Sequence, residues 1–245
     1  MTGDKMKNTK LMAVFSAFIF SIVLMIFPVV SGVIVTINDM DTLNSYWVQG
    51  IFMMMSLTVP ALFMLITKMR LGQIGFNGIE KGSIKTVLYF VPLIVSKVGF
   101  LFLGVNKDVH VIFALIFFTI AIGLSEEMYF RGIILQKLIT CFSIKQTVIL
   151  SAVFFAVVHA SQAFSGVGIV MTALTIVNAL IFGIIASEIV LLTKSIVFVI
   201  IWHAMYDFVN WISLVKGTTE VIVILIQSVI MVIYAIYLWS KLSDK

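Results

Sequence analysis

Charged residues are scarce in this chain of 245 residues, and cysteine is nearly absent from it. Only 11% of the residues are Asp, Glu, Lys or Arg, and Cys141 is the single cysteine. One cysteine cannot form an intrachain disulfide or a thiolate metal cluster. So few charges beside 62% hydrophobic residues exclude a water-soluble globule and predict a polytopic helical membrane protein.

The net charge of +5 is not gathered in one basic segment. Its distribution fits the orientation of a membrane protein better than nucleic-acid binding, so we expect the lipid bilayer as a partner and no nucleic acid. No low-complexity tract, linker or convincing internal repeat divides the sequence. We therefore predict a single integral membrane domain over residues 1–245.

Eight apolar runs have about the length that crosses a bilayer as a helix. The predicted spans are residues 11–37, 46–66, 86–105, 109–139, 147–163, 167–186, 196–215 and 221–239. The first run is too long for a signal-peptide core and lacks a small-residue cleavage site, so we expect it to be retained. Pro28 and Pro60 predict kinks within their spans. The predicted fold is an all-α membrane bundle of about eight transmembrane helices.

Basic residues are concentrated on one side of this predicted bundle. If the N-terminus is cytoplasmic, only Lys107 and Lys216 lie outside. Twelve basic residues then lie on the cytoplasmic side: Lys5, Lys7, Lys10, Lys68, Arg70, Lys81, Lys85, Lys137, Lys145, Lys194, Lys241 and Lys245. This positive-inside asymmetry predicts that both termini are cytoplasmic.

Three other polar residues and one loop are not expected to take part in chemistry. Lys97 lies near the external end of the third span, where its side chain can reach the interface. Asn178 is expected to form interhelical hydrogen bonds. Glu188 lies near the cytoplasmic end of its span, where solvent is available. The glycine-rich loop at 71–85 predicts a short amphipathic piece on the cytoplasmic surface.

The stretch SEEMYFRG places three charges, Glu126, Glu127 and Arg131, inside the fourth predicted span. An ionised side chain near the bilayer centre costs about 2.5 to 3.5 kcal/mol even on lenient scales, so such a group indicates function. Glu127 and Arg131 are four residues apart on one helix face, which predicts an ion pair. Glu126 is rotated from Glu127 by about 100 degrees and is left free for chemistry.

Further polar residues fall at a similar depth in two other spans. His159 lies in the fifth span, and His203 and Asp207 share a face of the seventh. Counting along each helix places the set roughly 10 to 20 Å below the cytoplasmic surface. We therefore expect three helices to close one polar site, with Phe155 on the His159 face and Asn210 extending the Asp207 face.

Two mechanisms are compatible with these residues. Glu126 in a low-dielectric pocket is suited to take a proton from water, with His159 orienting the water or protonating a leaving group. His203 and Asp207 would then donate to a developing oxyanion, Asp207 only when protonated. Alternatively, Glu126, His159, His203 and Asp207 hold zinc, whose bound water is the nucleophile. The sequence does not decide between them.

These residues resemble three motifs of the CPBP intramembrane proteases, which include the type II CAAX prenyl endopeptidases and the bacterial Abi proteins. The first motif is Glu126 and Glu127, three residues and Arg131. The second is Phe155, three residues and His159, and the third runs from His203 to Asp207. The resemblance covers about residues 110–215, and it indicates a bacterial-type member of the family.

The resemblance implies an eight-helix fold and hydrolysis of a peptide bond in a membrane-associated peptide or protein. It assigns water activation to Glu126, assistance to His159 and oxyanion stabilisation to His203 and Asp207. Family members have been described both as metalloproteases and as metal-independent glutamate proteases. Asp207 stands where the eukaryotic prenyl proteases have asparagine, which raises the weight of the zinc alternative. Bacterial relatives are linked to bacteriocin self-immunity and peptide maturation.

Other functions remain open on the sequence. A proton-coupled transporter could use the same intramembrane acids and histidines, although no inverted repeat supports transport. A catalytically silent immunity or binding protein could keep the same fold. Other protease chemistries lack their motifs, since the chain has no HExxH or GxSG sequence and Asp207 is the only aspartate within a span. We predict hydrolysis near the cytoplasmic side of the membrane.

Overall fold

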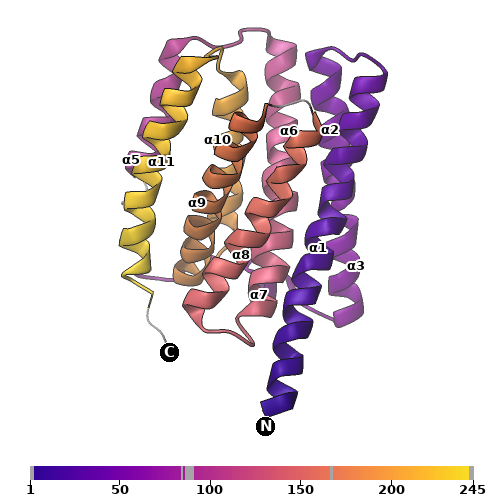
Figure 1. Cartoon of the computed structure of the whole chain (residues 1–245), viewed down its shortest axis with the longest axis vertical. Helices are drawn as coiled ribbons and strands as arrows, with labels where there is room; N and C mark the ends of the chain where they lie inside the picture. Colours follow the sequence, from indigo (N-terminus) through magenta and orange to yellow (C-terminus); the bar gives the residue numbers. More distant parts are fainter. Residues whose placement is uncertain (1–2, 84, 86–90, 166–167, 243–245) are drawn as a thin grey trace.

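The protein is a bundle of helices that run alongside one another (Figure 1). The computed structural model describes residues 3–83, 85, 91–165 and 168–242. Regular structure in these residues is helical, with one isolated antiparallel bridge between Val105 and Ser213. The first and last described residues lie at the same end of the bundle, at the bottom of Figure 1.

The first half of the chain contains α1 (Gly3–Ile37), α2 (Thr42–Ser56), α3 (Thr58–Thr67), η1 (Leu71–Ile74), α5 (Val91–Gly99) and η3 (Phe100–Leu103). The second half contains α6 (Val109–Glu127), η4 (Met128–Ile134), α7 (Leu135–Leu138), α8 (Ile144–Val158), η5 (His159–Ser165), α9 (Ile169–Thr193), α10 (Val197–Ile212) and α11 (Thr218–Trp239).

The predicted all-α membrane bundle is confirmed. Six helices are long and apolar enough to cross a membrane, and Leu93–Leu103 and Val197–Ile212 are two shorter apolar helices. These eight segments overlap the eight predicted spans, although the sixth helix continues to Thr193 instead of ending at residue 186. Residues 86–90, at the start of the third predicted span, and residue 167, at the start of the sixth, lie outside the described residues.

Polar side chains fix where several helices begin. The Asp108 carboxylate accepts a hydrogen bond from the His110 backbone N–H at 2.9 Å and caps α6. Ser143 and Gln146 form a reciprocal capping box at the start of α8. Such caps satisfy backbone donors that have no partner within the helix. They set the first residue of the helices that carry the Glu126 and Phe155 motifs.

The second span is divided into two helices just before Pro60, where a kink was predicted. Pro60 has no backbone N–H and so cannot donate to the carbonyl of Ser56, four residues earlier. The helix is interrupted at Leu57, between α2 and α3. The Ser56 carbonyl instead accepts a hydrogen bond from the Tyr129 hydroxyl at 2.9 Å. A carbonyl released by proline therefore ties the second span to η4.

Two glycines allow close helix contacts around the centre of the bundle. A Cβ atom on Gly123 of α6 would lie 2.9 Å from the Ile200 carbonyl oxygen of α10. A Cβ atom on Gly183 of α9 would lie 2.9 Å from the Cα atom of Ala152 in α8. Small residues let membrane helices approach closely. These contacts bring α6 to α10 and α8 to α9, and these four helices carry most of the candidate residues.

The glycine-rich loop does not simply lie on the surface as predicted. Ile74 is completely buried, and the Ile196 backbone N–H donates to the Gly75 carbonyl at 2.8 Å. The Ser195 hydroxyl donates to the Asn77 carbonyl at 2.7 Å. The turn between α9 and α10 offers these partners, so the loop is docked into the bundle at the end where the termini lie.

Candidate active site

The chain changes helix geometry directly after the glutamate pair. The α-helix α6 ends at Glu127, and Met128–Ile134 forms the π-helical segment η4 before α7 resumes α geometry. All seven residues of η4 are buried. A π segment inserts extra backbone into a turn and is frequent at functional sites. Here it separates Glu126 and Glu127 from the following α-helical turn and leaves Arg131 facing back toward them.

Glu127 and Arg131 form the predicted ion pair. The Arg131 Nη1 atom lies 3.0 Å from Glu127 Oε1, and neither side chain is exposed. Arg131 Nη2 also donates to the Gly183 carbonyl at 3.3 Å, and the guanidinium lies 4.4 Å from the Phe155 ring centroid. A buried charge needs such partners to offset its desolvation. Arg131 thus links η4 to α8 and α9.

Glu127 has a second partner, His203, that the sequence analysis did not predict. His203 Nδ1 lies 2.8 Å from Glu127 Oε1. Since Glu127 is paired with Arg131 and acts as an acceptor, the His203 Nδ1 atom carries the hydrogen. Its Nε2 atom is therefore turned away from Glu127. One carboxylate orients both an arginine and a histidine from another helix.

Glu126 remains available for chemistry. Its side chain is 13% exposed, and its Oε2 atom is buried without a hydrogen-bond partner among the described residues. This Oε2 atom lies 3.8 Å from His203 Nε2. Asp207 Oδ2 lies 3.6 Å from the same nitrogen. The imidazole of His203 therefore lies between two carboxyl groups and within reach of both.

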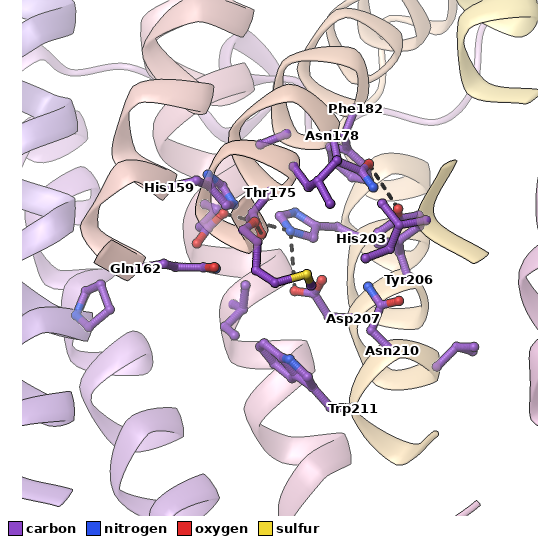
Figure 2. A pocket seen from close by; sticks show the side chains of 18 of the residues that line it. His159, Gln162, Thr175, Asn178, Phe182, His203, Tyr206, Asp207, Asn210 and Trp211 are labelled. Atoms are coloured by element: carbon purple, nitrogen blue, oxygen red, sulfur yellow. Dashed lines mark hydrogen bonds and ion pairs between the residues drawn. The ribbon is translucent and has the colours of Figure 1, made fainter. Parts of the chain in front are cut away.

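His159 faces the same space from another element. The α-helix α8 ends at Val158, and His159 begins η5. His159 Nδ1 lies 2.9 Å from the Phe155 carbonyl oxygen, which can only accept, so Nδ1 carries the hydrogen and Nε2 is an acceptor. Figure 2 shows the side chains of His159, His203 and Asp207 turned toward a common space. The three motifs therefore meet.

Phe155 forms the apolar wall between the two histidines. Its ring centroid lies 4.7 Å from that of His159 and 5.8 Å from that of His203. Phe182 of α9 contacts both Phe155 and His203, at 5.8 and 4.7 Å between centroids. Phe182 carries no sequence signal, because one phenylalanine among 21 is not distinctive. Together the two rings limit how far either imidazole can rotate.

Lys97 is buried rather than placed at the interface as predicted. Its side chain is 3% exposed and donates a hydrogen bond to Asn210 Oδ1. Its Nζ atom also lies 3.7 Å from the centroid of the Tyr206 ring. Tyr206 in turn donates to Asn178 Oδ1 at 3.1 Å, which confirms the interhelical role of Asn178. The polar face of α10 provides acceptors that the sequence of α5 alone does not reveal.

Glu188 is also buried, and its predicted access to solvent is wrong. Glu188 is 0% exposed, and neither of its carboxyl oxygens has a hydrogen-bond partner among the described residues. The helix α9 that carries it packs against α8 and α11. Packing on both sides covers this turn of α9 even though it lies near the end of the span.

A cavity of about 650 Å³ adjoins the polar cluster. Glu126, His159, His203 and Asp207 all line it, together with the rings of Phe155 and Phe182. Asn178 and Asn210 line it further along α9 and α10 (Figure 2). Apolar walls with a few convergent polar groups are typical of ligand sites, and this volume suits several residues of a peptide.

The zinc alternative requires at least three converging ligand side chains. In the part of the chain that the structure describes, no group of three His, Cys, Asp or Glu side chains is arranged to hold a metal ion. The side chains in this arrangement do not fit a metal site, so no step below is routed through zinc.

A polytopic helix bundle with this buried cluster is the arrangement that the resemblance to intramembrane proteases implies. Residues 108–209 match the family model described as "Type II CAAX prenyl endopeptidase Rce1-like". This match covers less than half of the chain and supports the predicted CPBP membership. None of the curated proteins matches the chain. The matched residues contain all three motifs.

Proposed function

We propose that this protein is an intramembrane endopeptidase in which Glu126 activates the water that hydrolyses a peptide bond. The observation that carries the proposal is the contrast between the two adjacent glutamates. An Oε2 atom without a hydrogen-bond partner among the described residues is common to both glutamates, but Oε1 of Glu127 is held by Arg131 and His203, whereas Glu126 lines the cavity. A general base needs such freedom to receive a proton.

In the first step the Glu126 carboxylate takes a proton from a water molecule in the cavity. His159 Nε2 accepts a hydrogen bond from the other water hydrogen, because its Nδ1 hydrogen is given to the Phe155 carbonyl. The water oxygen forms a bond to the substrate carbonyl carbon, and the electron pair of the carbonyl π bond moves to its oxygen. Both hydrogens of the water are thus oriented before the attack.

In the second step the negative oxygen of the tetrahedral intermediate is stabilised from α10. His203 in its imidazolium form donates from Nε2, while Glu127 keeps Nδ1 engaged. Asp207 donates a second hydrogen bond when it is protonated. Preorganised donors of this kind contribute about 2.7 to 4 kcal/mol each in other hydrolases. Glu127 contributes to this step by fixing the orientation of the His203 imidazole.

In the third step the intermediate collapses and the C–N bond breaks. The proton held by Glu126 moves to the leaving nitrogen, so one water is consumed and one carboxyl group and one amine are formed. The substrate is a peptide or protein at the membrane. On the family resemblance, we propose a role in maturation of a peptide or in self-immunity to a bacteriocin.

The test compares wild type with Glu126→Gln and His159→Ala at matched levels in membranes. Mass spectrometry of small membrane-associated peptides should show products that are lost in both variants. Glu80→Gln is the matched control, because Glu80 is exposed and only its backbone makes the hydrogen bonds seen. Identical peptide patterns in all four proteins would refute proteolysis and favour transport or a silent role.

A further inference from the structure

In the part of the chain that the structure describes, the lining of the cavity extends from the candidate active site toward one end of the bundle. On α1, which starts at Gly3, its lining residues are Pro28, Val29 and Gly32, in the last third of the helix. On α2 and α11 they fall within the first turns: Tyr46 and Gln49, and Glu220, Val223 and Ile224. These parts of the helices lie at the end opposite both termini, at the top of Figure 1.

At the other end, which we call the closed end, the described part of the docked loop packs beneath the site. A Cβ atom on Gly132 of η4 would lie 3.4 Å from the Ile74 carbonyl oxygen and 3.5 Å from the Ile74 Cβ atom. The Glu80 backbone N–H donates to the Thr193 carbonyl at 3.0 Å, beyond the hydrogen bonds at Gly75 and Asn77. The described part of the loop thus packs against the segment that follows Glu127.

The route from the mouth to the catalytic cluster is lined by aromatic rings. Tyr46 stacks on Phe118 at 5.7 Å between ring centroids, and Phe118 stacks on Trp211 at 5.0 Å. At the mouth, Lys216 and Glu220 lie 3.9 Å apart and the lysine side chain is 72% exposed. Stacked rings leading to a polar site suit a peptide segment with large apolar side chains.

Charge distinguishes the two ends of the bundle. The closed end carries the basic loops that contain Lys68, Arg70, Lys81 and Lys194, whereas Lys107 and Lys216 are the basic residues of the loops at the open end. Basic loops remain in the cytoplasm when membrane proteins insert. The open end therefore has the composition of an extracytoplasmic surface.

We infer that the substrate is an apolar peptide segment that enters the active site from the extracytoplasmic side of the membrane. This inference rests on the proposed function and adds the side of access and the class of substrate. The sequence-based expectation concerned where hydrolysis takes place, whereas this inference concerns the side from which the substrate enters. The catalytic glutamate lies deep in the bundle, but the space leading to it runs outward.

The first test maps the two ends with a membrane-impermeant maleimide. Cys141→Ser provides a cysteine-free background, because Cys141 is the only cysteine. Lys216→Cys, or Thr219→Cys as a second variant, should be labelled in intact cells. Lys81→Cys on the closed end should be labelled only after permeabilisation. Labelling of Lys81→Cys but not of the mouth variants in intact cells would overturn the inference.

The second test measures access by a substrate. A peptide that depends on Glu126 for cleavage in the membrane comparison is synthesised and added outside right-side-out or inverted vesicles. We expect at least tenfold faster cleavage by right-side-out vesicles. Equal or faster cleavage by inverted vesicles would overturn the access route while leaving the protease function intact. Failure to cleave the peptide in detergent would instead count against the protease function.

Discussion

His203 Nδ1 donates a hydrogen bond to Glu127 Oε1 at 2.8 Å, although the two residues are 76 positions apart in the chain. The same oxygen lies 3.0 Å from Arg131 Nη1. Glu127 therefore aligns the imidazole that faces the cavity and also neutralises a buried guanidinium. In the proposed mechanism the adjacent glutamates therefore have different tasks, one structural and one chemical.

The different tasks of the glutamates predict different losses. Glu127→Gln should lower both activity and the free energy of unfolding, because it leaves Arg131 without its counter-charge. Breaking a buried ion pair costs about 3 to 5 kcal/mol. Glu126→Gln should abolish cleavage and leave stability nearly unchanged. Thermal unfolding in detergent, measured beside peptide cleavage, distinguishes them; equal destabilisation by both substitutions would contradict this division.

Asp207 should make activity depend on pH in a way that asparagine does not. A carboxyl group donates to the oxyanion only while protonated, so rising pH removes this donor from the wild type. The amide of Asp207→Asn donates at every pH. We expect the variant to keep activity at neutral pH and to lose less of it as pH rises. Superimposable pH profiles of kcat for the two proteins would argue against oxyanion donation by Asp207.

Lys97 should support the reaction through α10. Its contacts with Asn210 and Tyr206 hold the helix face that carries Asp207. Lys97→Met keeps the length of the side chain but removes the hydrogen bond and the charge, and we expect kcat to fall about tenfold or more with a smaller change in KM. Lys107→Met, at an exposed loop position, is the control. Unchanged kcat in Lys97→Met would show that the lysine has only a packing role.

Chelation provides the test of metal dependence. The mechanism proposed above uses only residues of the chain, so incubation with 1,10-phenanthroline followed by its removal should leave the cleavage rate unchanged. The same treatment of a zinc peptidase in parallel confirms that the chelator is effective. Loss of activity that is restored by zinc, but not by magnesium, would support the zinc alternative and require a rearrangement of the four polar side chains.

The sequence predicted the parts of the fold that depend on local patterns. Eight apolar segments follow from hydropathy, and the ion pair between Glu127 and Arg131 follows from their spacing on one helix. The break at Pro60 follows from the missing N–H. The meeting of the three motifs needed the further assumption of similar depth in the membrane.

Contacts between distant helices could not be predicted in the same way. The hydrogen bond from Lys97 to Asn210 joins residues 113 positions apart, and it depends on the rotation of two helices about their axes. Burial of Glu188 and docking of Ile74 likewise depend on neighbouring helices that a hydropathy pattern does not identify. The π segment at Met128–Ile134 has no composition that marks it in advance.

The hydrogen bond from the Tyr129 hydroxyl to the Ser56 carbonyl connects a region inside the family match to a region outside it. Ser56 and Pro60 lie outside the matched residues 108–209, whereas Tyr129 stands between Glu127 and Arg131 in the first motif. The N-terminal helices are therefore part of the framework that holds the catalytic segment in register. A fragment limited to the matched residues would lack this support, so we expect the proposed activity to need the N-terminal helices as well.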